Sequence, residues 1–362
     1  MRGRILVALM LAGSLAASAA AQPAPGPGGP PPAGARPAGP PRAALPGPEP
    51  IEHIVGNVYK IFGGGGNTLV VVQHDGVVLV DTKLPGNGPA IMEQVRTVTQ
   101  LPVKLIISTH SHPDHIGSTD YLRQQFPNVR IVMNEGGKAE ILAAPNANPA
   151  LVPTETFTDH MSIGEGDERL ELYHTGRGHT NGDTFVVVPS AHLLFMGDVM
   201  AWNMAPFLPA GGATAITEEL EHLVATVKDV DIVVEGHGYV NNWAGLVLLT
   251  RFHRALLTAA RAAYDRGDPP GAAVAELERN PEWGPLLNHR IKKGLEYGNT
   301  PFARANMNVN IAYAEFAGEP VGFGIANGGP LAATDKHKGS NPADTAPPSP
   351  EMLAAATRPD RP

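Results

Sequence analysis

The chain contains no cysteine among its 362 residues. It therefore has no thiolate metal ligand, no disulfide and no lipid-attachment cysteine. Basic residues are also few: 27 Lys and Arg stand against 35 Asp and Glu, for a formal net charge of -8. Nucleic-acid-binding proteins need a basic face, so this balance argues against a nucleic-acid partner. We expect a small-molecule substrate, and the sequence does not indicate an oligomeric state.

Long apolar runs are scarce as well. One covers residues 5–15, after Arg2 and Arg4, and Ala19-Ala20-Ala21 then precedes Gln22. This order is typical of a secretory signal peptide, here residues 1–21. The run is too short to span a bilayer comfortably, which takes about 20 residues, although a retained membrane anchor is the alternative. We expect a secreted or periplasmic protein without membrane contact after signal cleavage.

Composition divides the rest of the chain into three parts. Residues 22–50 are dominated by Pro, Gly and Ala, and residues 326–362 have a similar character. Segments with so little to bury are expected to form disordered tethers. Residues 51–325 are long enough for one sizeable core and are predicted to be the catalytic domain.

The most informative stretch is His110-Ser111-His112-Pro113-Asp114-His115, directly after the apolar run 103–107. It places three of the chain's 14 histidines and one aspartate within six residues. Imidazole and carboxylate form the ligand set that zinc prefers, and manganese and iron also accept it. A buried strand followed by such a loop presents its ligands at the strand's carboxyl end. The simpler alternative is a polar loop that is rich in histidine.

Three further residues of the same kind follow strand-like runs later in the chain. His179 lies within residues 178–183, Asp198 follows residues 193–197, and His237 stands between Gly236 and Gly238. Small neighbouring residues allow close approach of backbone and metal. These positions are therefore candidates for the same metal centre.

In this order, His-x-His-x-Asp-His, Gly-His-Thr, Gly-Asp and Gly-His-Gly resemble the metallo-β-lactamase superfamily of hydrolases, over about residues 51–250. The resemblance includes a glyoxalase II-like binuclear metal site with two zinc ions per chain, or manganese or iron instead. It also includes Asp81, as an aspartate that supports the ligand loop without binding metal. The implied ligands are His110, His112 and His179 for one ion, Asp114, His115 and His237 for the other, and Asp198 as a bridge between them.

The pattern of apolar residues also predicts a repeat. Residues 67–81 read as a hairpin around Asp75-Gly76, and a helix at 89–98, a strand at 105–108 and the histidine loop follow. The second half repeats this order with strands at 183–189 and 192–196, a helix at 217–228, a strand at 231–235 and His237. Chance similarity of two hairpins is the alternative.

A true repeat predicts two half-domains packed sheet against sheet, with helices outside and the metal ligands along one edge. The superfamily resemblance implies the same α+β fold, a four-layer αββα sandwich of two mixed β-sheets flanked by helices. Beyond it, we expect helices at Trp243–Asp265 and at 271–278, and a partly helical segment at 291–316.

The expected chemistry is hydrolysis. Two divalent ions about 3.5–4 Å apart can generate a bridging hydroxide near neutral pH. Asp198 suits the bridge because each of its oxygens can address one ion, and Asp114 is expected to be required for catalysis. We interpret the site as one that cleaves an ester, a thioester, a lactone or a β-lactam-like cyclic amide.

Two other functions share these motifs. One is an iron-dependent redox or sulfur-oxidising enzyme on the same fold. Flavodiiron relatives carry a glutamate where His112 stands, and mononuclear sulfur-oxidising relatives lack a complete second site, which His115 provides here. The other is a non-catalytic metal-binding protein.

Substrate features are less decisive. A cysteine-containing β-lactamase branch has its cysteine in place of Asp198 and a lysine in place of Ala201, so glyoxalase II-like and lactonase-like hydrolases resemble this chain more. Gly63–Gly66 is either a mobile flap or a flexible part of a hairpin. The remaining hypotheses are a binding face or core packing for Trp202, Met204, Phe207 and Leu208, an oxyanion donor at Tyr239, a carboxylate contact at Arg177, and packed or surface positions for His160, His174 and His192.

Overall fold

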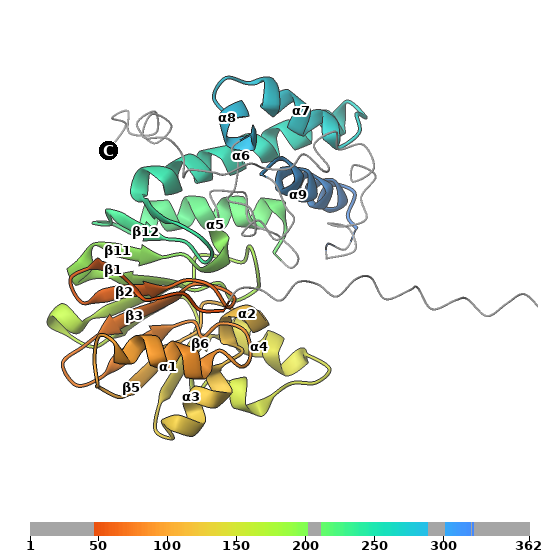
Figure 1. Ribbon diagram of the computed structural model, residues 1–362. Helices are drawn as coiled ribbons and strands as arrows, with labels where there is room; N and C mark the ends of the chain where they lie inside the picture. Colours follow the sequence, from red (N-terminus) through yellow and green to blue (C-terminus); the bar gives the residue numbers. More distant parts are fainter. Residues whose placement is uncertain (1–46, 202–210, 289–300, 320, 322–362) are drawn as a thin grey trace, which may run out of the picture. The chain divides into compact units, whose positions relative to one another are not determined.

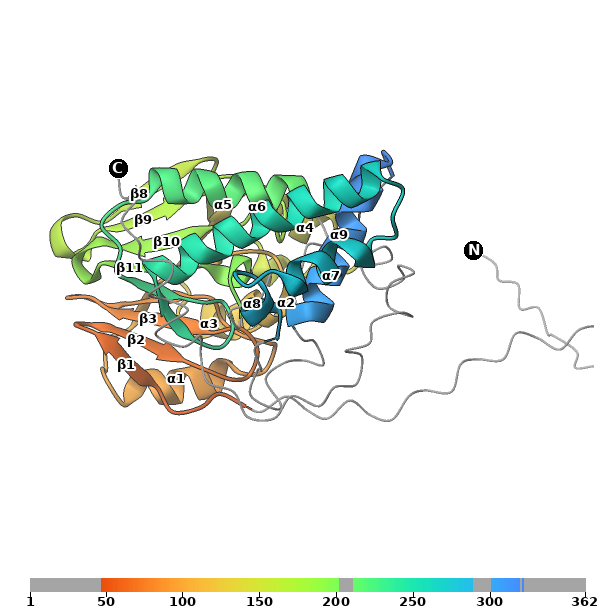
Figure 2. The same ribbon diagram turned by 90° about the horizontal axis from the view of Figure 1, so that it is seen from above.

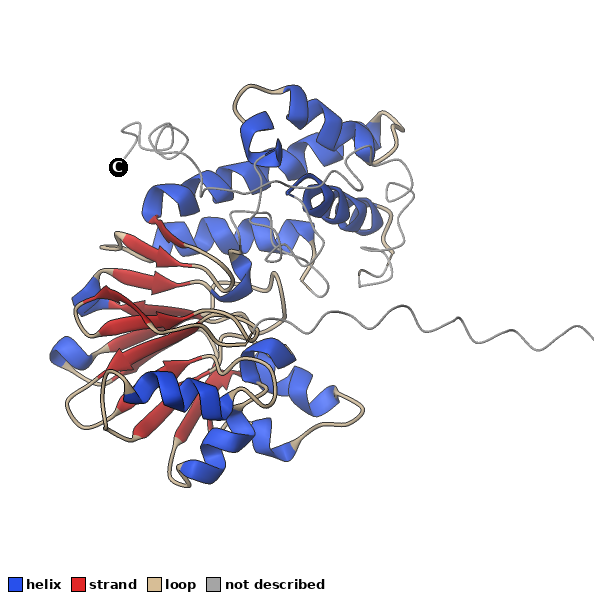
Figure 3. Cartoon of the chain, in the orientation of Figure 1, coloured by secondary structure: helices blue, strands red, loops and turns tan. Residues whose placement is uncertain are grey.

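Two mixed β-sheets lie face to face in the computed structural model, with helices on both outer sides (Figures 1 and 3). The structure describes residues 47–201, 211–288, 301–319 and 321. The seven-stranded sheet has the order β1 (Glu52–Val55), β2 (Val58–Ile61), β3 (Thr68–Val72), β4 (Val77–Val80), β5 (Val103–Ile107), β6 (Arg130–Asn134) and β7 (Glu155–Phe157). The six-stranded sheet has the order β13 (Val240–Asn242), β12 (Ile232–Val234), β11 (Leu193–Phe195), β10 (Phe185–Val188), β9 (Leu170–Tyr173) and β8 (His160–Ile163).

The strands at the centre of both sheets are apolar on both faces because both faces are covered. Successive side chains of a strand point to opposite sides. On β3, Leu69 and Val71 belong to the core between the sheets. Val70, between them, packs instead with the outer helices. A continuous apolar run is the expected pattern for a strand in a middle layer.

The outer layers pack along helical stripes. On the side of the seven-stranded sheet, α1 (Gly88–Arg96) buries Ile91, Met92 and Val95, and α3 (Thr119–Gln125) lies beside it. On the other side, α5 (Ala213–Thr226) buries Ile216, Leu220 and Leu223 against the six-stranded sheet. Figure 2 shows α5 next to the long helix α6 (Trp243–Asp265). Four layers therefore follow in the order helix, sheet, sheet, helix, and the predicted αββα fold is confirmed.

The repeat predicted from the sequence is also present. In the first half, the antiparallel hairpin β3–β4 leads through α1 to β5, which pairs parallel to β4. In the second half, the hairpin β10–β11 leads through α5 to β12, which pairs parallel to β11. Each half has an aspartate after its hairpin and a histidine after its parallel strand: Asp81 and His110 in the first, Asp198 and His237 in the second.

Further helices pack on α5 and α6, the helices that cover the six-stranded sheet. The predicted helix Trp243–Asp265 is α6, and the one predicted at 271–278 is α7 (Gly271–Arg279). They are followed by α8 (Gly284–Asn288) and α9 (Pro301–Phe316), while residues 289–300 of the segment predicted as partly helical lie outside the described residues. Among the described residues, no helix combines the length and the apolar character that crossing a bilayer requires.

Candidate metal centre

The histidine loop leaves the carboxyl end of β5 and turns into the short helix α2 (Pro113–Ile116). His112 is extended, and Pro113 starts the helix, a position where a missing N–H costs nothing. The backbone N–H of His115 then donates to the carbonyl of His112 at 3.0 Å. The loop thus presents His110 from the bend that follows β5, His112 in extended backbone, and Asp114 and His115 on the first helical turn.

The structure brings His110, His112 and His179 together in a first group. One nitrogen of each ring lies within 4.8 Å of the other two. The ring of His112 approaches His179 edge to face, with centroids 4.6 Å apart, and His112 Nδ1 lies 2.8 Å from His179 Nε2. His179 comes from the loop between β9 and β10, so the group joins the two half-domains.

Asp114, His115 and His237 form a second group whose donor atoms also lie within 4.8 Å of one another. His237 Nε2 is 3.3 Å from Asp114 Oδ2 and 3.2 Å from His115 Nε2. His237 follows β12, again from the second half-domain. Three donors converging on one point are an arrangement that can hold a cation.

Asp198 lies between the two groups. Its Oδ1 is 3.1 Å from His115 Nε2 and 3.3 Å from His237 Nε2, both in the second group. Its Oδ2 is 3.6 Å from His179 Nε2, in the first group. The two oxygens of one carboxylate therefore address the two groups separately, as a bridging ligand must.

Asp81 supports both groups from behind. It is fully buried in the left-handed region, with φ of 64°. Oδ2 accepts a hydrogen bond from His115 Nδ1 at 2.7 Å and another from the Thr109 hydroxyl at 2.7 Å. Its other oxygen accepts from the Thr109 backbone N–H at 2.8 Å. Asp81 is close enough to His110 and His115 to resemble a third metal group, but its oxygens are already engaged by these donors.

These bonds also set which ring nitrogen of His110 faces the site. The Thr109 hydroxyl has one proton and donates it to Asp81, so its 2.9 Å contact with His110 requires His110 Nδ1 to be the donor. Burial, followed by the neighbouring imidazoles, holds the pKa of His110 well below its usual value. The ring is therefore neutral, and Nε2 keeps its lone pair for a cation.

The second group has a different charge state. Burial opposes a charge on His115, but the carboxylates of Asp198, Asp81 and Asp114 outweigh it and raise its pKa well above the usual value. The pKa of His237 is raised for the same reason, chiefly by Asp198. Burial likewise disfavours charge on Asp114 and Asp198, yet the two imidazoles lower both pKa values. Without metal, protons on His115 and His237 thus balance the carboxylates.

A buried strap of glycines holds the two halves of this centre together. Gly66 donates its N–H to the Asp114 carbonyl at 2.9 Å, and a Cβ on Gly66 would overlap the ring of His115. Asn67, the next residue, donates its N–H to the Gly236 carbonyl at 2.7 Å. The mobile flap considered for Gly63–Gly66 is wrong, because these residues are buried.

Lys83 fixes both ends of the segment that contains Gly63–Gly66. Its side chain is fully buried, and Nζ donates to the carbonyls of Ile61 at 2.7 Å and Gly66 at 2.8 Å. Burial lowers the pKa of this amine to about 7, although Asp81 acts in the opposite direction. The cost of burying an amine is evidence that the strap must be held in place.

Two buried atoms at the centre indicate that a metal fits. His110 Nε2 is shielded from solvent and has no hydrogen-bond partner among the described residues. Asp198 Oδ1 is equally shielded, and its neighbours at 3.1 and 3.3 Å are the ring nitrogens of His115 and His237, two other predicted ligands. Buried polar atoms are rarely left without a partner. Imidazole nitrogen and carboxylate oxygen are also suitable donors for a divalent cation such as zinc. The donor set therefore matches the predicted ligands, whose role in metal binding stays a prediction.

The other candidate residues lie elsewhere. His160 contacts Glu171, His174 contacts the Asp183 carbonyl and His192 contacts the Asp229 carbonyl. Arg177 is exposed. The Tyr239 hydroxyl is buried and lacks a hydrogen-bond partner in the described part of the chain, and its role as a donor to an oxyanion stays a prediction. Trp202, Met204, Phe207 and Leu208 lie outside the described residues.

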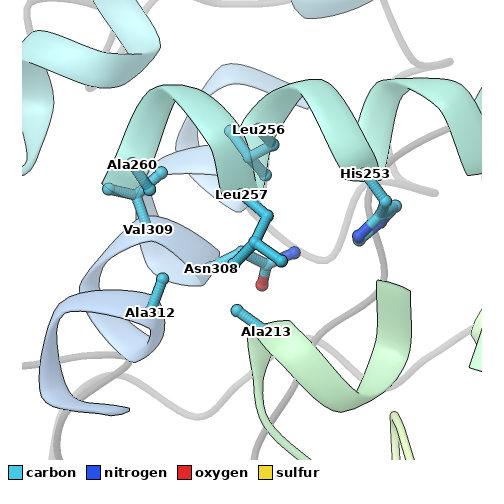
Figure 4. A pocket seen from close by; sticks show the side chains of 8 residues that line it. All are labelled: Ala213, His253, Leu256, Leu257, Ala260, Asn308, Val309 and Ala312. Carbon is cyan, nitrogen blue, oxygen red and sulfur yellow. The ribbon is translucent and has the colours of Figure 1, made fainter. Parts of the chain in front are cut away.

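A small cavity of about 10 Å³ lies among α5, α6 and α9 (Figure 4). Leu256, Val309 and Ala312 form part of its apolar wall, and His253 and Asn308 are its polar members. None of the predicted metal ligands lines it. It is also below the ~300–1,000 Å³ that ligand pockets usually occupy, so it is a packing feature of the helices.

Comparison with known proteins agrees with the fold and the motifs. The sequence model of the metallo-beta-lactamase superfamily matches residues 61–237. The 2,4-dinitroanisole O-demethylase subunit alpha of Nocardioides sp. (strain JS1661) is 28% identical over 166 residues, which cover 43% of this chain and 48% of that protein. The hydroxyacylglutathione hydrolase of Prochlorococcus marinus (strain MIT 9312) is 35% identical over 116 residues, 31% of this chain and 43% of that protein. The chain thus spans about half the length of these relatives.

Among solved structures, the DIM-1 metallo-beta-lactamase aligns with 58% of this chain and 99% of its own, with 17% identity and a TM-score of 0.48. The match to the superfamily model covers the strands β3–β5 and β10–β12 and ends at His237. It therefore includes every residue of the two groups and Asp198. Through this region, the chain belongs to the metallo-β-lactamase superfamily.

Proposed function

We propose that this protein is a metal-dependent hydrolase with two zinc ions. The position of Asp198 carries this proposal: its oxygens face a histidine triad on one side and an Asp–His–His triad on the other. A single structural metal would need only one such group. When bound, two divalent ions supply an activated water near neutral pH and polarise the bond to be cleaved.

The residues of the chain supply the rest. His110, His112 and His179 would hold one ion, and Asp114, His115 and His237 the other. The side chain of Asp114 is 31% exposed, more than that of Asp198 at 15%. A solvent-accessible carboxylate beside the site would be placed to orient the attacking water and to relay a proton to a leaving group.

Zinc is favoured by the ligand chemistry. The centre offers imidazole nitrogens and carboxylates and has no thiolate, since the chain lacks cysteine. Histidine at position 112, in place of another carboxylate, favours zinc over the harder iron. Manganese and iron are the alternatives, and iron would indicate a redox enzyme on the same fold.

For the substrate, we propose an ester, thioester, lactone or cyclic amide. The names of two relatives suggest two further substrates to test. These are a hydroxyacylglutathione thioester, from the hydroxyacylglutathione hydrolase, and 2,4-dinitroanisole, from the O-demethylase subunit. We also propose export, on the basis of the signal-peptide pattern in residues 1–21.

The direct test is a panel of chromogenic esters, thioesters, lactones, a cephalosporin and 2,4-dinitroanisole, with and without chelator. We expect hydrolysis of at least one, lost with chelator and restored by Zn²⁺. Asp114→Ala should abolish that activity while the circular dichroism spectrum stays unchanged, and exposed Asp159→Asn is the matched control. Unchanged turnover in Asp114→Ala would contradict the mechanism. Iron with visible absorbance in the purified protein would favour the redox alternative.

A further inference from the structure

Glu140 on α4 (Glu135–Ala143) connects the two loops that carry the first group of histidines. Its Oε1 accepts hydrogen bonds from the Asn181 backbone N–H at 2.9 Å and from Asn181 Nδ2 at 2.7 Å. Its Oε2 accepts a hydrogen bond from the Ser111 hydroxyl. Both carboxylate oxygens of Glu140 therefore accept hydrogen bonds from these two loops.

The two partners of Glu140 occupy special places in the sequence. Ser111 lies between His110 and His112. Asn181 lies two residues after His179. The three histidines come from two separate segments, and the distance between these segments decides whether one cation can contact all three rings. Glu140 is bonded to both segments at once.

The helix that carries Glu140 is itself fixed. Its N-cap is Asn134, whose side chain accepts from the Gly136 N–H at 2.8 Å and donates to the Phe157 and Thr158 carbonyls. The start of the helix packs closely on residues 181–182: a Cβ on Gly136 would overlap the Asn181 carbonyl, and a Cβ on Gly182 would overlap the Gly137 backbone. Because α4 is fixed by these contacts, the Glu140 carboxylate can hold the two loops in place and does not move with them.

Glu140 also brings a carboxylate next to the first group, whose three members are all histidines. A carboxylate this near would stabilise a bound cation through its charge.

We propose that Glu140 is a positioning residue for the first metal ion, and that it holds the His110–His112 and His179 loops at the separation that one cation requires. It does not contact the ion. Removing a group that orients metal ligands typically weakens metal binding about 10–100-fold. The effect should be confined to the first ion, because the second group is held by Asp81, Gly66 and Lys83.

The test is metal binding by the full chain, with Co²⁺ as a spectroscopic probe and Zn²⁺ in calorimetric competition. Glu140→Ala is expected to weaken the first ion about 10–100-fold and to leave the second within about twofold. In a His237→Ala background the titration reports on the first group alone, and in a His179→Ala background it reports on the second group alone. Glu140→Gln should retain most of the affinity, since its amide oxygen still accepts from Asn181 and its amide N–H can donate to Ser111. Glu135→Ala, exposed on the same helix, is the matched control.

The outcomes separate this inference from the proposed function on which it rests. If the unaltered protein binds two ions and Glu140→Ala binds the first equally well, only the role of Glu140 is overturned. Equal weakening of both ions would also overturn it, because a general structural defect would then explain the loss. Failure of the unaltered protein to bind any divalent ion would overturn the proposed function and this inference together.

Discussion

His115 donates its Nδ1 hydrogen to Asp81 Oδ2 at 2.7 Å, and both residues are fully buried. The same oxygen of Asp81 accepts from Thr109, which in turn contacts His110. One aspartate thereby orients one ligand of each predicted ion. Its left-handed backbone, which costs other residues about 1–3 kcal/mol, is another indication that this position is constrained.

Substitution of Asp81 should weaken metal binding more than folding. Asp81→Asn keeps a residue that tolerates a positive φ, but it places an amide N–H toward donors. We expect affinity for Zn²⁺ to fall about 10–100-fold, measured by competition with a chelating dye. Asp81→Ala should also lower the melting temperature because it adds backbone strain. Exposed Asp159→Asn is the control, and normal affinity in Asp81→Asn would show that Asp81 does not orient the ligands.

Gly66→Ala should displace His115 without placing any charge in the site. A Cβ at this position would occupy the space of the imidazole ring. We expect the second ion to bind at least about tenfold more weakly, with a smaller effect on the first, in Co²⁺ titrations monitored by absorbance. Gly47→Ala is the control, because a Cβ there meets nothing within 4 Å. Equal loss of both ions would mean that the whole centre, and not His115, has moved.

The two ions should respond differently to pH. The raised pKa values of His115 and His237 mean that the second ion must displace protons, whereas the lowered pKa values of His110 and His112 leave these two ligands of the first ion already neutral. Second-ion affinity should therefore fall as pH decreases from 8 to 6, by about tenfold per pH unit for each proton displaced. Calorimetry in buffers of different ionisation enthalpy counts these protons. Identical pH dependence of both ions would contradict this assignment.

Glu219 should make the fold less stable as pH rises. Its carboxyl is fully buried on α5, neither oxygen has a hydrogen-bond partner among the described residues, and burial followed by repulsion from Asp183 raises its pKa well above the usual value. An acid that is harder to ionise in the folded state costs stability once pH exceeds its unfolded pKa of about 4.3. Burial also raises the pKa of Asp183, to about 7.

Glu219→Gln should remove this dependence. In urea unfolding of the metal-free protein at pH 5, 6 and 7, the free energy of unfolding of the variant should rise relative to that of the unaltered chain, by up to about 1.4 kcal/mol per pH unit. Glu218→Gln, the exposed neighbour on the same helix, should show no such gain. Parallel stability curves for Glu219→Gln and the unaltered chain would mean that Glu219 does not bind its proton more tightly when folded.

Local patterns predicted much of the fold and identified the candidate site. The hairpin at 67–81, the helix at 243–265 and the repeated order of elements depend on turn residues and periodicity within single segments. Edge strands such as β1 and β13 were not predicted, because each is three or four residues long and partly exposed. A segment of three or four residues is too short to show the alternation of apolar and polar residues from which a strand is predicted.

The supporting residues could not be found in the same way. Glu140 is a single acid on a helix, and its partners lie 29 and 41 positions away in sequence. Lys83 resembles any surface lysine until the structure shows it buried beneath Gly66. Gly63–Gly66 suggested mobility, since glycine is flexible in isolation, but here its lack of a side chain permits close packing on His115. Metal-ligand motifs are local, whereas the contacts that orient them depend on the tertiary fold.

The most direct test of the central claim is anomalous X-ray scattering at the zinc edge from crystals of the zinc-loaded protein. We predict two peaks about 3.5–4 Å apart, one beside His110, His112 and His179 and the other beside Asp114, His115 and His237, with Asp198 between them. A single peak, or no peak at Asp198, would contradict the account.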